Sequence, residues 1–279
     1  MNKYFFLLTL ALPVMQAAPT MDQQQSGRGS VAIPYFRCGV EADELQQMVL
    51  AYTNPTGTNA KVTFEVFDAA GKLLTIPYEG QDGAITRLTS ATLDVSARGA
   101  GVIKTSAAGS KLQRGWLRIT SNPPGAVAVT AHGWTTNGAS PAKLVFTLHP
   151  NAGGTAQIMG PFTDGTTDQF LLANNGAADR VTLLARSRTG EEMCRATMQL
   201  QPGEFYKQPM KDHLPCTAGK TATLEVNSET GNTAALVLIF AKTGEIIPIE
   251  AQIAAGKPQP TLEEALQDLL QRIRKAAGL

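Results

Sequence analysis

The side chains with the widest chemical repertoire in this sequence are three histidines, His132, His149 and His213. No two of them stand two or four residues apart and no HExxH segment occurs, so the local spacing of a zinc site is absent. The GxSxG elbow of a serine nucleophile is also missing, and no cysteine stands in the sequence context of a catalytic thiol. The spacing therefore predicts no catalytic, cofactor-binding or metal site, unless distant strands bring such residues together.

Three cysteines are the next candidates. If the protein folds in an oxidising compartment, Cys194 and Cys216 are the natural disulfide pair, because both fall in the second half of the chain. The bridge would close a loop of about 23 residues and contribute roughly 3 kcal/mol if unstrained. Cys38 is then left over, either buried or available for a bond between molecules. The alternative is three unpaired thiols.

Aromatic side chains could form a flat platform on which a sugar stacks. The first half contains Trp116 and Trp134 together with Tyr35, Tyr52 and Tyr78. Aromatic residues make up only 6% of the chain, and a tryptophan in a β-sandwich is more often a core anchor. Carbohydrate binding is therefore an alternative and not the preferred interpretation.

Residues 1 to 18 have the pattern of a secretory signal peptide. Lys3 precedes the apolar run Tyr4–Leu12, and Pro13 and the small residues Ala17 and Ala18 follow. Without this segment the chain carries 23 basic and 23 acidic residues, which argues against a dedicated nucleic-acid binder. No later segment reaches 18 apolar residues, so we expect no integral membrane segment after signal removal and a secreted or periplasmic location. Residues 19–30 are polar and rich in Gly and Ser, and we expect a flexible linker there.

Beyond residue 30 short alternating segments are separated by Gly, Asn, Asp and Pro. In Ala60–Phe67 the residues Val62, Phe64 and Val66 share one face, which is the two-residue period of a half-buried strand. Similar segments recur with turn residues between them, a spacing typical of an antiparallel sandwich.

The second half repeats this order of segments. Val62, Phe64, Val66 and Gly71 match Val181, Leu183, Ala185 and Gly190 at a constant offset of 119, and Leu117, Ile119 and Ser121 match Leu224, Val226 and Ser228. Duplication of one β-domain would leave this pattern, although generic strands could match by coincidence. We predict a first sandwich domain over 31–150 and a second over 151–255.

The run VLAYTNPTGTNAKVTFEVFDAAGKLL, followed by IKTSAAG and GWLRITS, resembles tandem Ig-like β-sandwich modules of uncharacterised secreted bacterial proteins of the acidobacterial type. The resemblance extends loosely over residues 31 to 250 and implies a fold and a secreted protein. It carries over no catalytic residue. The second repeat departs from it, with Asn174-Asn175-Gly176 where the first has Asn-Pro-Thr.

After Gly256–Pro260 the period changes from 2 to 3.6, which predicts an amphipathic helix within 256–279. Thr261 and Glu264 fit a capping box, and the apolar stripe consists of Leu262, Leu266, Leu269, Leu270 and Ile273. Such a stripe needs a partner. It either docks on a sandwich of the same chain or pairs with a second copy or another protein, whereas a polar face with charges of both signs disfavours membrane binding.

The sequence thus predicts an all-β protein of two tandem antiparallel Ig-like β-sandwich domains followed by a C-terminal amphipathic α-helix. We expect an exported structural or interaction protein without enzyme activity or cofactor, whose protein or cell-surface partner the sequence does not identify. A carbohydrate-binding accessory module and an enzyme with a site assembled at the domain joint are the alternatives.

Overall fold

The computed structural model describes residues 29–80, 83–107, 111–137, 141–163, 168–240 and 246–253. The predicted signal peptide and most of the predicted linker lie outside these residues. So does the predicted C-terminal helix, with Leu262, Leu266, Leu269, Leu270 and Ile273.

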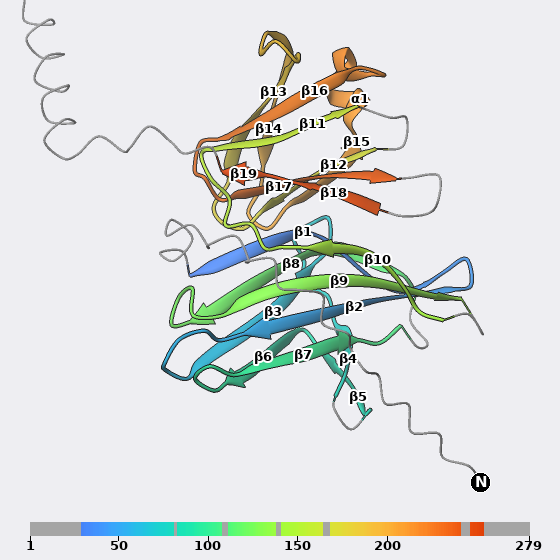
Figure 1. Ribbon diagram of the computed structural model, residues 1–279, viewed down its shortest axis with the longest axis vertical. Coiled ribbons are helices and arrows are strands. Elements are labelled where there is room, and N and C mark those ends of the chain that lie inside the picture. The colour runs from blue at the N-terminus through green and yellow to red at the C-terminus, as the bar shows by residue number, and fades with distance from the viewer. Residues whose placement is uncertain are drawn as a thin grey trace, which may run out of the picture.

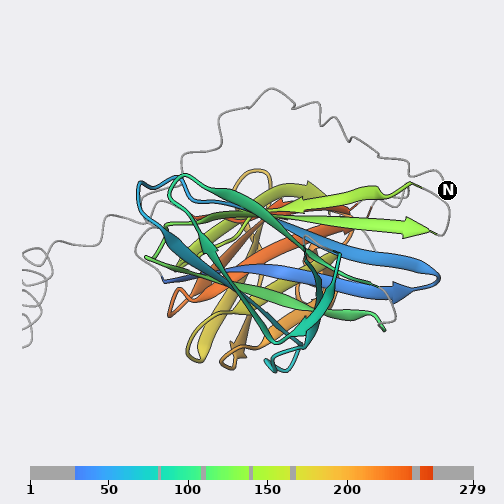
Figure 2. The ribbon, with the colours of Figure 1, turned by 90° about the horizontal axis from the view of Figure 1, so that it is seen from below.

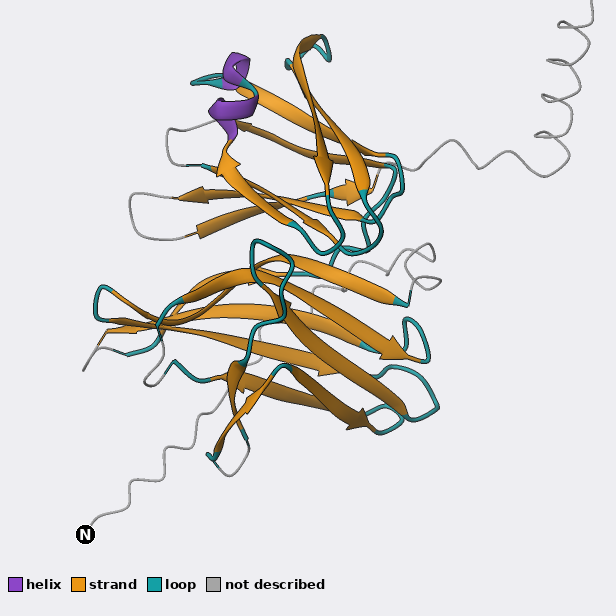
Figure 3. Cartoon of the chain, turned by 180° about the vertical axis from the view of Figure 1, so that it is seen from behind, coloured by secondary structure: helices purple, strands orange, loops and turns teal. Residues whose placement is uncertain are grey.

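The described chain is predominantly β, which confirms the predicted all-β class (Figure 3). Every pairing between two named strands is antiparallel. None of the described helices is long and apolar enough to cross a membrane.

The strands form two groups that pair only within themselves. The N-terminal half comprises β1 (Ser30–Glu41), β2 (Glu44–Thr53), β3 (Ala60–Phe67), β4 (Ile76–Glu79), β5 (Ile85–Leu88), β6 (Ser90–Val95), β7 (Ala100–Thr105), β8 (Gln113–Asn122), β9 (Ala128–Asn137) and β10 (Lys143–Leu148). The C-terminal half comprises β11 (Ala156–Thr163), β12 (Gln169–Asn174), β13 (Asp179–Arg186), β14 (Glu192–Leu200), β15 (Phe205–Pro209), α1 (Met210–His213), the 3-10 turn η1 (Pro215–Thr217), β16 (Thr221–Ser228), β17 (Thr233–Phe240), β18 (Ile246–Glu250) and β19 (Gln252–Ile253). Figure 1 shows one half above the other, and Figure 2, which looks along the stack, shows them overlying one another.

Each half has two layers with matching strand order. The N-terminal half contains the order β1-β8-β3-β6 in one layer and β7-β2-β9-β10 in the other. The C-terminal half contains β11-β16-β13-β14 and β15-β12-β17-β18. The N-terminal half adds the hairpin β4–β5 beside β7, and its two layers are joined because β1 pairs with both β8 and β2.

The register matches as well. Val62 lies opposite Ser121 in the first half, and Val181 lies opposite Ser228 in the second. Buried Asn54 directly follows β2, and buried Asn174 is the last residue of the equivalent strand β12. Each donates its side-chain amide to three backbone carbonyls and accepts a backbone N–H two residues later. Both asparagines therefore hold the same kind of loop in the same way, by satisfying backbone groups that would otherwise be unpaired.

The sheet β15-β12-β17-β18 is buried on both faces in its central strands. Alternate residues of β12 and β17, such as Leu172 and Val237, belong to the hydrophobic cluster inside the C-terminal half. Their neighbours Leu171, Leu236 and Leu238 belong to a cluster that also contains the core of the N-terminal half. Because both faces are covered, these strands have continuous apolar runs instead of alternating ones.

The outer face of β3 and β8 contacts the second half at the turn after β14. The Trp116 ring is fully buried, stacks on Phe67 with ring centroids 4.6 Å apart, and donates its indole N–H to the Gly203 carbonyl at 2.9 Å. Gly71 lies against the backbone of Gly203, where an added Cβ at residue 71 would be 3.0 Å from the carbonyl carbon. Two tight turns therefore meet with no space for a side chain.

The turns at Gly71 and Gly190 provide a matched test of this contact. Both glycines have positive φ, at 78° and 84°, but a Cβ on Gly190 would meet nothing within 4 Å. We expect Gly190→Ala to lower the free energy of unfolding by about 1–2 kcal/mol through backbone strain alone. Gly71→Ala should lower the free energy of unfolding by more than this, because the contact with the Gly203 turn of the other half must also shift. Urea denaturation of the two variants measures the difference, and equal losses would contradict the close packing of residue 71 against Gly203.

Candidate functional site

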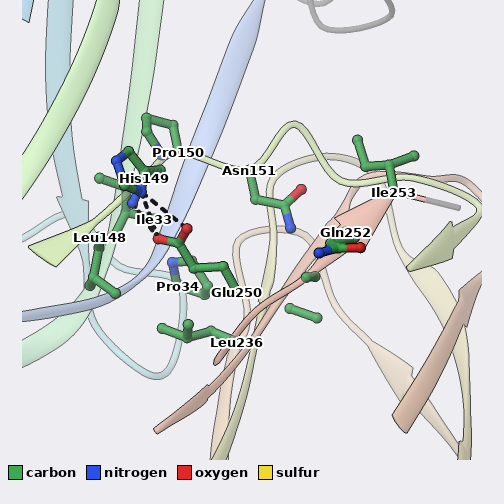
Figure 4. A pocket seen from close by; sticks show the side chains of 12 residues that line it. Ile33, Pro34, Leu148, His149, Pro150, Asn151, Leu236, Glu250, Gln252 and Ile253 are labelled. Atoms are coloured by element: carbon green, nitrogen blue, oxygen red, sulfur yellow. Dashed lines mark hydrogen bonds and ion pairs between the residues drawn. The ribbon is translucent and has the colours of Figure 1, made fainter. Parts of the chain in front are cut away.

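A hollow of about 310 Å³ lies at the joint between the halves, where β1 and β17 meet β18, β19 and the segment that follows β10 (Figure 4). Its lining is mostly apolar, with a few polar side chains from both halves. The lining residues are Ile33, Pro34, Leu148, His149, Pro150, Asn151, Ala235, Leu236, Glu250, Ala251, Gln252 and Ile253. A second hollow of about 500 Å³ shares His149, Glu250 and Gln252 with the first.

His149 and Glu250 form the polar centre of both hollows. The backbone N–H of His149 donates to Glu250 Oε1 at 2.6 Å, and the ring Nδ1 lies 3.1 and 3.0 Å from the two carboxylate oxygens (Figure 4). The hydrogen bond with Glu250 raises the pKa of His149 above its ordinary value, although partial burial opposes this rise. Both side chains remain accessible, at 58% and 38% exposure. The pair ties the end of β10 to the end of β18 while leaving the imidazole open to solvent.

His132 lies next to this pair on β9. Its Nδ1 is 3.0 Å from the hydroxyl oxygen of Thr147 on β10. Burial, and to a smaller extent the charge of His149, lower the pKa of His132. The two histidines therefore have pKa values displaced in opposite directions, because only one of them has a carboxylate partner.

A polar network of buried side chains fixes the segment that joins the halves. Asn151 exchanges two backbone hydrogen bonds with Ala32 of β1, at 2.7 and 2.8 Å. Its side-chain amide donates to Gln157 Oε1 at 2.9 Å, and Gln157 Nε2 donates to the Thr233 carbonyl at 2.6 Å. The sequence predicts a domain boundary at residues 150 and 151, and the structure shows residues 151–154 buried next to that position.

An imidazole oriented by a carboxylate is part of a general acid–base device, but hydrolysis through a covalent intermediate also needs a nucleophile. The first hollow has no Ser, Thr, Cys, Tyr or Lys in its lining. The hydroxyl of Thr147 in the second hollow is hydrogen bonded to His132 and not to His149. Within the described ranges no three His, Cys, Asp or Glu side chains group closely enough to hold a metal ion. The polar side chains at this joint pair with one another and connect the two halves.

The structure places the cysteines as follows. Cys194 on β14 and Cys216 in η1 form a disulfide, the pairing that the sequence predicts. Cys38 is buried in the N-terminal core, where its thiol donates to the Ser106 carbonyl at 3.3 Å. Of its two predicted states Cys38 is therefore in the buried one, and this burial raises the pKa of its thiol.

The aromatic candidates are spread over the fold. Trp116, Tyr35 and Tyr78 are buried, whereas Trp134 and Tyr52 are half-buried. No Phe, Tyr or Trp side chain among the described residues is exposed. Trp116 packs between the two halves, where it contacts Gly203, and does not lie on an outer surface.

The third predicted chemical candidate, His213, lies far along the C-terminal half from the joint. It ends α1 and forms a hydrogen bond through Nε2 with the hydroxyl of Tyr206 on β15, with the two rings edge to face. The structure therefore brings His132 and His149 together and leaves His213 with a different partner.

Sequence reasoning missed a buried carboxylate, Asp179, at the start of β13. It has no exposed surface and accepts hydrogen bonds from the hydroxyls of Ser228 and Thr233 and from the backbone N–H of Thr230 at 3.0 Å. Burial raises the pKa of this carboxyl, but the hydrogen bonds outweigh burial and hold the pKa below its ordinary value. Asp179 thus organises the β16–β17 turn.

Comparison with known proteins adds no relative, since no family profile and no curated protein sequence matches the chain.

The His149–Glu250 pair predicts a pH dependence. Because the folded-state pKa of His149 is raised, its stabilising contribution is complete below the unfolded value of about 6.5 and is lost as pH rises through the folded value. The pair is exposed, so we expect a contribution of less than about 1 kcal/mol. Glu250→Gln should return the His149 pKa towards 6.5 in an NMR titration, and His213 in the same spectra is the internal control. An unchanged His149 pKa in that variant would contradict the pairing.

Asp179 predicts the opposite pH dependence. Asp179→Ala leaves buried donors unsatisfied, and we expect it to lower the free energy of unfolding at pH 7 by roughly 2–4 kcal/mol. Because the folded-state pKa is lowered, the advantage of the wild-type protein is present above the unfolded value of about 3.9 and declines as pH falls through the folded value. Exposed Asp94→Ala is the control, and denaturant unfolding at several pH values is the measurement. Equal losses in the two variants would show that the network contributes nothing.

Proposed function

We propose that the protein is an exported, non-catalytic structural or interaction protein built from two Ig-like β-sandwich modules that are copies of one unit. It acts at the cell envelope or outside the cell. The matching strand order and register of the halves support the duplication. The disulfide supports an oxidising compartment, because such bonds persist mainly outside the cytosol.

The joint is the observation that carries this proposal. The apolar outer face of the sheet β15-β12-β17-β18 packs against the N-terminal half and holds the two halves in one orientation. The polar side chains that converge there pair with one another, His149 with Glu250 and Asn151 with Gln157. A joint of this kind suits a module that presents surfaces at a fixed spacing better than an enzyme that must open around a substrate.

An apolar surface beside the hollows supports an interaction role. Leu144, Ile158 and Ile247 are 39–47% exposed and lie on β10, β11 and β18, where β18 contacts both other strands. Large apolar side chains that are exposed on neighbouring strands are typical of protein contact sites. The carbohydrate-binding alternative has less support, because the described residues contain no exposed aromatic platform.

The enzyme alternative has one specific observation in its favour, the His149–Glu250 pair beside a hollow.

We expect purified protein to turn over no ester, glycoside or peptide substrate in a panel of chromogenic assays. A rate above background that disappears in His149→Gln and persists in His213→Gln would overturn the proposed non-catalytic role and locate an active site at the joint. A rate that is equal in all three proteins indicates a contaminant and leaves the expected absence of turnover intact.

A further inference from the structure

Three cations meet at the joint on the side of β8 and β15, away from the hollows. Arg37 on β1 and Arg114 on β8 are direct cross-strand partners, so their side chains leave the same face of the sheet. This is the face of Trp116, two residues along β8, which contacts the C-terminal half. Lys207 comes from that half, on β15, and its ammonium lies 5.7 Å from the centre of the Tyr35 ring. We call Arg37, Arg114 and Lys207 the cation cluster.

The cation cluster is not neutralised by its surroundings. Glu41 forms an ion pair with Arg114 and is, among the residues that the structure describes, the one carboxylate that acts on both Tyr35 and Lys207. Three positive charges against one negative charge leave an excess of two. Arg37 is placed over the Phe146 ring, with Cζ 5.4 Å from its centre, and this ring packs edge to face on Tyr35. Aromatic faces stabilise cations but supply no hydrogen-bond acceptor of full negative charge.

Two features show that this arrangement costs stability as it stands. Arg37 and Arg114 carry like charges directly opposite each other on neighbouring strands, and such charges repel. The Arg37 guanidinium shares a side-chain hydrogen bond with the Tyr35 hydroxyl, but its Nε is buried and has no hydrogen-bond partner. Burial, with smaller contributions from the charges of Arg114 and Arg37, also lowers the pKa of Lys207, and the opposing charge of Glu41 does not offset this.

We propose that the cation cluster binds a doubly charged tetrahedral oxyanion, a phosphate or sulfate group, between the two halves of the chain. Guanidinium groups match such oxyanions through paired hydrogen bonds, and an ammonium adds a point charge. The excess of two positive charges equals the charge of the ligand. Arg37 Nε gains its missing acceptor, and the repulsion between Arg37 and Arg114 is screened. Because the ligand contacts both halves, it also stabilises their packing against each other. This binding is separate from the interaction role proposed for the protein.

The test is a titration of the full chain with inorganic phosphate and, separately, with sulfate, against sodium chloride at equal ionic strength. Side-chain ¹H–¹⁵N spectra report on arginine Nε–Hε groups. We expect the Arg37 signal to shift saturably with both ions and not with chloride. Acetate, which carries a single charge, should bind about tenfold more weakly or worse.

Variants separate a built site from general salt effects. Lys207→Met and Arg37→Lys should each weaken phosphate binding by about tenfold, whereas Lys220→Met, which changes an exposed lysine of the same half, should leave it unchanged. Arg37→Lys keeps the charge, so a loss in that variant reports on the guanidinium hydrogen bonds, and circular dichroism verifies its fold. Isothermal calorimetry measures binding in variants that lack the Arg37 signal. No saturable shift, equal binding of acetate, or undiminished binding in Lys207→Met would each overturn the proposal.

Discussion

The burial of one sheet on both of its faces is the constraint on which the rest of this structure depends. A sandwich needs only one apolar face per sheet, yet β12 and β17 have apolar side chains on both. Leu171 and Leu236 would lose roughly 1.5–3 kcal/mol each if their face were left in water. The C-terminal half therefore reaches its stable state by packing against the N-terminal half, and the orientation of the halves follows from that packing.

Polar contacts make this orientation specific. Apolar packing tolerates sliding, but a hydrogen bond such as that from the Trp116 indole to Gly203 is satisfied in one arrangement only. The network from Asn151 through Gln157 to Thr233 has the same effect at the other edge of the joint. Buried polar groups without partners are costly, so a displaced joint would lose hydrogen bonds that water could not readily replace.

The polar and charged groups that converge between the halves depend on that fixed arrangement. His149 and Glu250 are 101 residues apart and belong to different halves, and the hollows beside them have walls from both. The cation cluster likewise combines Arg37 and Arg114 with Lys207 from the other half. A chain with two independent modules would contain the same residues but none of these sites. The packing of the two halves thus brings together side chains that neither half holds alone.

The sequence by itself determined the β class and the positions of many strands, and it favoured the Cys194–Cys216 pairing that the structure shows. These follow from local information, because the two-residue period of Val62, Phe64 and Val66 records which face is buried, and Gly71 and Gly190 mark turns that need positive φ. The continuous apolar runs in β12 and β17 also indicated burial on both faces. A short apolar run does not show, however, which part of the protein packs against it. Only the tertiary structure decided that His149 meets Glu250, that Trp116 faces the joint, and that Arg37 keeps an unpaired Nε. These contacts join residues of distant sequence position, and side-chain pairing at such distances depends on sheet register and on the docking of the halves, which no local period encodes.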